Sequence, residues 1–90
     1  MARVVLPQAL QGLAGGVRQL DVSGDTVGDM LDALAAEHPV LARRIRDEQG
    51  RLRRFVNLYV DGSDVRHCGG IDAAVAPDSE VLVIPSVAGG

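Results

Sequence analysis

The chain has 90 residues, enough for one small domain, and its composition of 47% hydrophobic and 23% charged residues excludes a disordered segment. A net charge of −3 argues against a nucleic-acid-binding domain, which usually carries a basic surface. The one cysteine, Cys68, excludes a disulfide framework, a cysteine zinc site and a cysteine-held iron–sulfur cluster.

The amino-terminal residues lack the pattern of a signal peptide, because Pro7 and Gln8 interrupt a short apolar run. No stretch approaches the length needed to span a membrane. We therefore expect a cytoplasmic protein that binds neither membrane nor nucleic acid. Six of the nine arginines fall between positions 43 and 54, and we interpret them as a solvated face around a loop.

Two strands are predicted at the amino end. Residues 2–6 form a short apolar run typical of a buried strand, and residues 17–22 alternate between polar and apolar side chains. Residues 7–16 contain one proline and three glycines, so we expect a loop there. Together these segments predict an amino-terminal hairpin with a long connection.

The main helix is predicted to begin after Thr26, a favourable N-cap with Asp29 three residues later. It should end at His38, because a residue before proline disfavours helical geometry. Its apolar residues recur with helical spacing along one stripe: Val27, Met30, Leu31 and Leu34. A second, short helix is predicted over residues 40–49, with Val40, Leu41 and Ile45 facing inward.

Three further strands are expected. Residues 55–60 alternate so that Val56, Leu58 and Val60 share one face, and Asp61-Gly62 then predicts a tight turn into a brief edge strand over residues 63–66. The last strand covers residues 81–84, and we expect Pro85 to interrupt its pairing. This order suits an α+β, β-grasp (ubiquitin-like) fold: a mixed sheet of four to five strands with one main helix packed across it. The first and last strands would lie side by side in its centre.

The carboxyl end suggests where the chemistry lies. We expect residues 1–85 to form the domain and residues 86–90 to form a flexible tail that ends in Gly89 and Gly90. Glycine loses the most backbone entropy on ordering, so this end suits an unhindered arm better than a stable element. The hypothesis is that the carboxylate of Gly90 is the functional group.

These residues resemble a known family. The ending Leu82-Val-Ile-Pro-Ser-Val-Ala-Gly-Gly90 resembles the MoaD/ThiS family of ubiquitin-like sulfur carriers. The stretch from Arg54 to Arg66, followed by Gly69-Gly70, is more specific and resembles the CysO branch, which supplies sulfur for cysteine synthesis.

The resemblance implies a protein co-substrate and not an enzyme. An E1-like enzyme would use ATP and Mg²⁺ to adenylate Gly90, and a sulfur donor would then leave a thiocarboxylate. The sulfur would pass to a PLP-dependent cysteine synthase, and a metallopeptidase would release the cysteinyl adduct. The carrier itself would bind no cofactor or metal and would be a monomer when free.

A docking surface is also predicted. If Val81 and Val83 face the core, alternation places Leu82 and Ile84 on the other face of the sheet, with Phe55 and Tyr59 beside them. A slip of one residue would exchange the two faces. We expect three residues that precede the terminal glycines to contact partners too: Pro85, Val87 and Ala88.

Several alternatives stay open. The chain could be the small subunit of molybdopterin synthase, or a carrier shared with sulfur-containing secondary-metabolite biosynthesis. It could also be a ubiquitin-like modifier that is joined to lysines of other proteins; the chain itself has no lysine. His38, His67 and Cys68 are interpreted as structural or surface residues, and Gly69-Gly70 as a turn.

Overall fold

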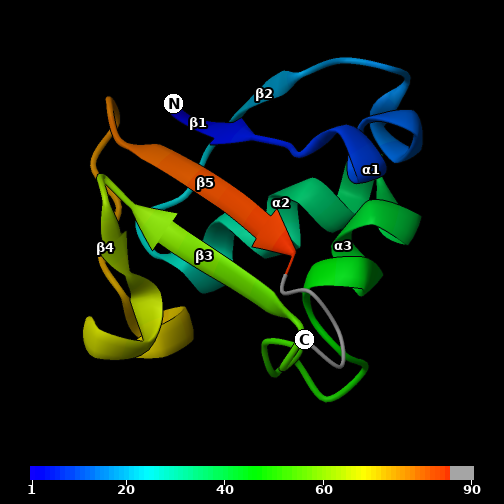
Figure 1. Cartoon of the computed structure of the whole chain (residues 1–90). Helices are drawn as coiled ribbons and strands as arrows, with labels where there is room; N and C mark the ends of the chain where they lie inside the picture. The colour runs from blue at the N-terminus through cyan, green and yellow to red at the C-terminus, as the bar shows by residue number, and fades with distance from the viewer. Residues whose placement is uncertain (86–90) are drawn as a thin grey trace.

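The computed structural model describes residues 1–85. Its five-stranded sheet has the order β2-β1-β5-β3-β4. The strands are β1 (Ala2–Val5), β2 (Gln19–Val22), β3 (Val56–Val60), β4 (Ser63–Asp64) and β5 (Glu80–Pro85). β1 and β5 pair in parallel, and the other neighbours are antiparallel. The predicted mixed sheet, with its first and last strands side by side, is confirmed (Figure 1).

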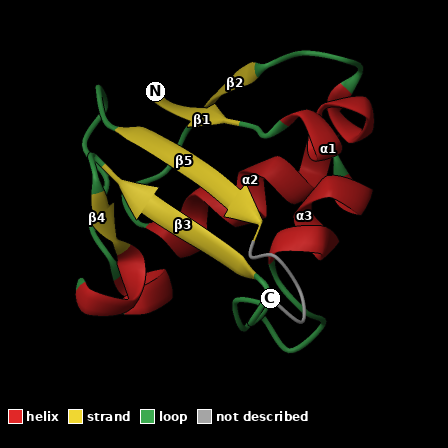
Figure 2. Ribbon diagram, viewed as in Figure 1, coloured by secondary structure: helices red, strands yellow, loops and turns green. Residues whose placement is uncertain are grey.

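Three helices accompany the sheet: α1 (Gln8–Gln11), α2 (Val27–Glu37) and α3 (Pro39–Ile45). Short 3-10 turns cover Gly12–Ala14, Val65–His67 and Gly70–Asp72. In the view of Figure 2, α2 passes behind β5 and β3, and α3 lies to the right of the end of β5. The sheet therefore has one face covered by helices and one open face. No helix within residues 1–85 is long and apolar enough to cross a membrane.

The main helix has the predicted cap and the predicted buried stripe. The Thr26 hydroxyl accepts a hydrogen bond from the Asp29 N–H at 3.1 Å, which satisfies one of the unpaired donors of the first turn. The helix ends at Glu37, immediately before His38. All four residues of the stripe are buried: Val27, Met30, Leu31 and Leu34.

The prediction of a plain loop over residues 7–16 is wrong. This segment forms α1 and a 3-10 turn, because Leu10 and Ala14 lie four residues apart and both enter the core. Gly15 then turns the chain with a φ of 76°. The following strand starts at Gln19 and not at Val17, a residue that is 41% exposed.

The second helix is shorter than predicted, and one of its inward residues was assigned wrongly. Leu41 and Ile45 are fully buried, but Val40 is 52% exposed. Helical residues are separated by about 100°, so a face centred between Leu41 and Ala42 turns Val40 away. The helix ends at Ile45 because Asp47 starts a turn. In this turn the Asp47 carboxylate accepts hydrogen bonds from the N–H groups of Gln49 and Arg51, each at 2.9 Å.

The Asp61-Gly62 turn is confirmed, and it also ties the hairpin to β5. Asp61 and Gly62 have φ values of 50° and 88°, as a two-residue hairpin turn with positive φ at both positions requires. The Asp61 carboxylate accepts the N–H of Glu80 at 2.9 Å and the hydroxyl of the buried Ser79 at 2.8 Å. The edge strand stops at Asp64, two residues before the predicted end, because residues 65–67 form a 3-10 turn that buries Val65.

The last strand is longer than predicted. Pro85 belongs to β5 and is the register partner of Val56, so it does not interrupt the pairing with β3. The parallel pairing with β1 ends at Val5 and Leu82. Beyond Leu82 the strand has a ladder on one side only, and a residue without an N–H is tolerated in such a position.

We predict that the two faces of the sheet differ in their effect on stability. Leu58 is 1% exposed beneath the helices, so Leu58→Ala should lower the free energy of unfolding by about 2–5 kcal/mol. Leu82→Ala, on the open face of the neighbouring strand, should lower it by no more than about 1 kcal/mol. Urea unfolding of both variants measures this difference, and equal losses would contradict the assignment of the faces.

A pH-dependent contribution is predicted for Asp61. The Glu80 N–H, and then the Ser79 hydroxyl, hold the pKa of this carboxyl below its ordinary value of 3.8. A carboxyl whose pKa is lowered by folding stabilises the fold at pH values above its ordinary pKa. This stabilisation is lost as the pH falls through the pKa of the folded state. Asp61→Asn should therefore be less stable than the wild type at neutral pH, and the difference should disappear in acid.

Urea unfolding of the wild type and Asp61→Asn across a pH series measures this effect. Asp78→Asn is the matched control, because it removes the same charge from an exposed neighbouring residue whose carboxylate accepts no hydrogen bond within residues 1–85. It should leave the free energy of unfolding nearly unchanged. A difference between Asp61→Asn and the wild type that persisted unchanged in acid would contradict the role of the ionised carboxylate.

Candidate functional site

Three of the predicted docking residues share the open face of the sheet. Tyr59 and Leu82 are register partners on β3 and β5, and both are half-buried. Ile84 lies two residues further along β5 and is 39% exposed. Their neighbours Val81 and Val83 are buried, which confirms the predicted orientation of β5. This face therefore carries an apolar group that the helices do not cover.

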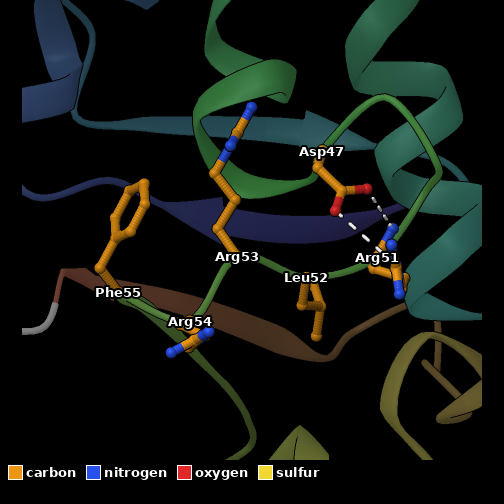
Figure 3. A pocket seen from close by; sticks show the side chains of 6 residues that line it. All are labelled: Asp47, Arg51, Leu52, Arg53, Arg54 and Phe55. Atoms are coloured by element: carbon orange, nitrogen blue, oxygen red, sulfur yellow. Dashed lines mark hydrogen bonds and ion pairs between the residues drawn. The ribbon is translucent and has the colours of Figure 1, made fainter.

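Phe55 does not belong to that alternation. It precedes β3 and is not part of it, and the residue is 47% exposed. The guanidinium carbon of Arg53 lies 6.0 Å from the centre of the ring, at the outer limit of a cation–π contact. Figure 3 shows the two side chains pointing to the same side of their loop. Phe55 thus lies at the end of the sheet, beside the start of β3.

Of the residues from Pro85 onward that are predicted for partner binding and chemistry, the structure describes Pro85 alone. Pro85 is exposed at the end of β5, opposite Val56. The other residues predicted for partner binding and chemistry lie outside the described residues: Val87, Ala88, Gly89 and Gly90.

The loop between α3 and β3 forms a pocket that sequence reasoning missed. An open hollow of about 650 Å³ is lined by Asp47 and by the five consecutive residues from Arg51 to Phe55 (Figure 3). The pKa of the Asp47 carboxyl is lowered, first by the N–H of Arg51 and then by that of Gln49, with the positive charges of Arg51 and Arg53 adding to the effect. The only signal of this pocket in the sequence is the cluster of arginines, for which a solvated face is the simpler interpretation.

Backbone and side-chain bonds hold this loop in place. The Arg53 N–H donates to the carbonyl of Ile45 at 3.0 Å, and the Arg53 side chain donates to the carbonyl of Arg43. Arg66 reaches the start of β3 from the following hairpin. Its guanidinium donates to the Asn57 side chain at 2.6 Å and to the carbonyl of Val56 at 3.0 Å. The position of the pocket is thus fixed relative to the end of the sheet.

Residues 1–85 contain no group of three or more His, Cys, Asp or Glu side chains placed to hold a metal ion. Cys68 is an exposed thiol after a 3-10 turn, and His38 caps the junction of α2 and α3. What the described surface offers is an apolar sheet face and a cationic loop. Both features suit the binding of a partner.

The chain is similar to known proteins over nearly its whole length. The ThiS family model matches residues 4–90. The chain is 39% identical to the sulfur carrier protein CysO of Mycobacterium tuberculosis over 89 residues, 97% of this chain and 96% of the relative. The crystal structure of that CysO matches with a TM-score of 0.90 and 36% identity, and covers 97% of this chain and 100% of its own.

Two further relatives are informative. The crystal structure of the Amycolatopsis orientalis BexX/CysO complex contains a chain that matches with a TM-score of 0.87 and 34% identity, over 100% of both chains. The small archaeal modifier protein 1 of Haloferax volcanii is 37% identical over 73 residues, 80% of this chain and 79% of the relative. These matches confirm both the β-grasp fold and the resemblance that we read from Phe55–Arg66 and the glycine ending. The chain belongs to the ThiS family and is a homologue of the sulfur carrier protein CysO.

Proposed function

We propose that this chain carries sulfur as a thiocarboxylate on Gly90 and donates it to cysteine biosynthesis. The observation that carries the proposal is the match to CysO over nearly the full length of both chains, together with a family match that extends through Gly90. The partners would be an E1-like adenylating enzyme, a PLP-dependent cysteine synthase and a metallopeptidase for the cysteinyl adduct.

The proposed chemistry follows from the state of a terminal carboxylate. Its pKa is about 3.5, so at neutral pH it is an anion that can attack phosphorus but is inert as an acyl donor. One carboxylate oxygen attacks the α-phosphorus of ATP, and pyrophosphate leaves. A sulfur nucleophile then attacks the carbonyl carbon of the mixed anhydride, and AMP leaves with that oxygen. The net result is the exchange of one oxygen for sulfur, with ATP and Mg²⁺ supplied in the active site of the activating enzyme.

The structure gives this tail a firm origin. β5 lies between β1 and β3, with Val81 and Val83 in the core. An enzyme that binds residues 86–90 therefore meets a fixed surface next to them, formed by Ile84, Leu82 and Tyr59 on the open face. The Amycolatopsis orientalis complex, in which CysO is bound to BexX, supports the view that a carrier of this fold docks on protein partners.

A second candidate is a protein modifier whose Gly90 is joined to lysines of target proteins. The similarity to small archaeal modifier protein 1 favours it. The two functions separate in an immunoblot of a lysate from the native host with an antibody to this chain. A ladder of heavy adducts on the blot would favour the modifier. A single band on the blot, together with a gain of sulfur in the intact mass of the purified chain, would favour the carrier.

The first functional prediction concerns Gly90. Incubation with ATP, sulfide and an E1-like enzyme should raise the intact mass by one sulfur-for-oxygen exchange. A variant with one alanine added after Gly90 should show no exchange, because a Cβ next to the reacting carbonyl crowds the adenylate and the glycine carboxylate is no longer free. Exchange in this variant without trimming of the alanine would refute the mechanism.

The second concerns the open face. Leu82→Asp should fold normally, because Leu82 lies outside the buried core. It should lower kcat/KM for adenylation by about ten- to a hundredfold, the equivalent of losing about 1.5–3 kcal/mol of apolar burial on docking. Val40→Asp is the matched control, since it places the same charge on an exposed apolar residue of α3. A parental rate for Leu82→Asp would contradict docking through this face.

A further inference from the structure

Positive charge is concentrated in the basic segment, which we define as residues 43–54. It contains six arginines and two acidic residues, a formal charge of +4, whereas the rest of the chain holds three arginines and ten acidic residues. The protein is thus acidic overall with one basic region. Charge segregated in this way steers an oppositely charged partner toward one part of a surface.

Only part of this charge is neutralised within the chain. Arg46 forms an ion pair with Asp32 at 2.7 Å, and Arg51 lies 3.8 Å from the Asp47 carboxylate. The other four arginines have no carboxylate within 4.0 Å among residues 1–85: Arg43, Arg44, Arg53 and Arg54. Arg53 is engaged by the carbonyl of Arg43 and by the ring of Phe55, but these contacts do not neutralise its charge. These guanidinium groups can therefore accept carboxylates from outside the chain.

The basic segment lies where the tail begins. Its last residue, Arg54, is followed by Phe55 and then by Val56, the register partner of Pro85. Figure 1 shows the loop after α3 next to the start of β3 and the end of β5. The basic segment therefore lies beside the end of β5, the point from which the residues after Pro85 continue.

The reach of the tail decides what these arginines can contact. Five extended residues span at most about 18 Å, whereas charges are screened beyond about 8 Å at physiological salt. For a tail that binds in the extended form, arginines at its base lie too far from a nucleotide at its tip. They act instead on the protein surface around the entrance to the active site that receives the tail.

The pocket adds an apolar component. Leu52 and Phe55 line it together with Arg51, Arg53 and Arg54. The loop is already held by the bonds from Arg53 to Ile45 and from Asp47 to Arg51, so little ordering is needed when a partner binds. A site of this kind suits a segment with acidic side chains and an apolar residue.

We infer that the basic segment docks on an acidic surface at the entrance to the active site of the enzyme that adenylates Gly90. This inference rests on the proposed function and specifies its docking step. The open face supplies apolar burial, and the arginines set the rate of encounter and the orientation.

The test is charge reversal at one exposed arginine. Arg54→Glu changes a residue that lines the pocket but forms no ion pair within residues 1–85. Arg18→Glu is the matched control, with the same change in net charge at an exposed arginine outside the basic segment. Adenylation is followed as pyrophosphate exchange in low and high salt with the full chain, and urea unfolding verifies that both variants fold.

Arg54→Glu should lower kcat/KM by about tenfold in low salt through KM, with kcat retained, and the loss should shrink in high salt. Arg18→Glu should stay within about twofold of the wild type. Equal effects of the two variants, or a loss confined to the later transfer of sulfur to an acceptor enzyme, would overturn the inference. If the wild type itself is never adenylated, the proposed function fails; if it is adenylated and Arg54→Glu is unimpaired, only this inference fails.

Discussion

The parallel pairing of the first and last strands is the constraint on which the rest of the structure depends. Val4 and Val81 are register partners in the centre of the sheet, and both are buried. Because a parallel pair cannot be joined by a tight turn, the chain between them must cross one face, and α2 and α3 lie on that crossing. The last strand is thereby buried between two neighbours, although it is the end of the described chain.

This arrangement separates stability from function. The face under the helices holds the buried residues of β3 and β5, and the other face keeps Tyr59, Leu82 and Ile84 accessible. The hydrogen bonds that the Asp61 carboxylate accepts from Ser79 and Glu80 fix the start of β5. The hydrogen bond that Arg66 donates to the Val56 carbonyl fixes the start of β3, opposite the end of β5. In the proposed function, the carrier supplies a carboxylate on a fixed base and a docking surface, and the enzyme supplies the nucleotide chemistry.

The basic segment shows how tertiary contacts change the meaning of a pattern. In the sequence it is a run of arginines with two acidic residues, which a solvated loop explains adequately. In the fold, Asp47 turns the chain, Arg53 ties it to α3, and the loop ends beside Phe55 at the end of the sheet. Its position next to the start of the tail gives the cluster a partner-binding interpretation.

The sequence alone determined the features that depend on local periodicity. Helical spacing identified the buried stripe of α2, alternation identified Val81 and Val83 as core residues, and Asp61-Gly62 identified a turn that needs positive φ. Tertiary structure decided the rest, because packing can override a local signal. It drew Leu10 and Ala14 into the core, turned Val40 outward, and gave Pro85 a partner strand on the side where no N–H is required. It also placed Pro85 at the same end of the sheet as Arg53 and Phe55. No local pattern encodes this proximity, because Pro85 is about 30 residues away in the sequence and is brought there only by the pairing of β3 with β5.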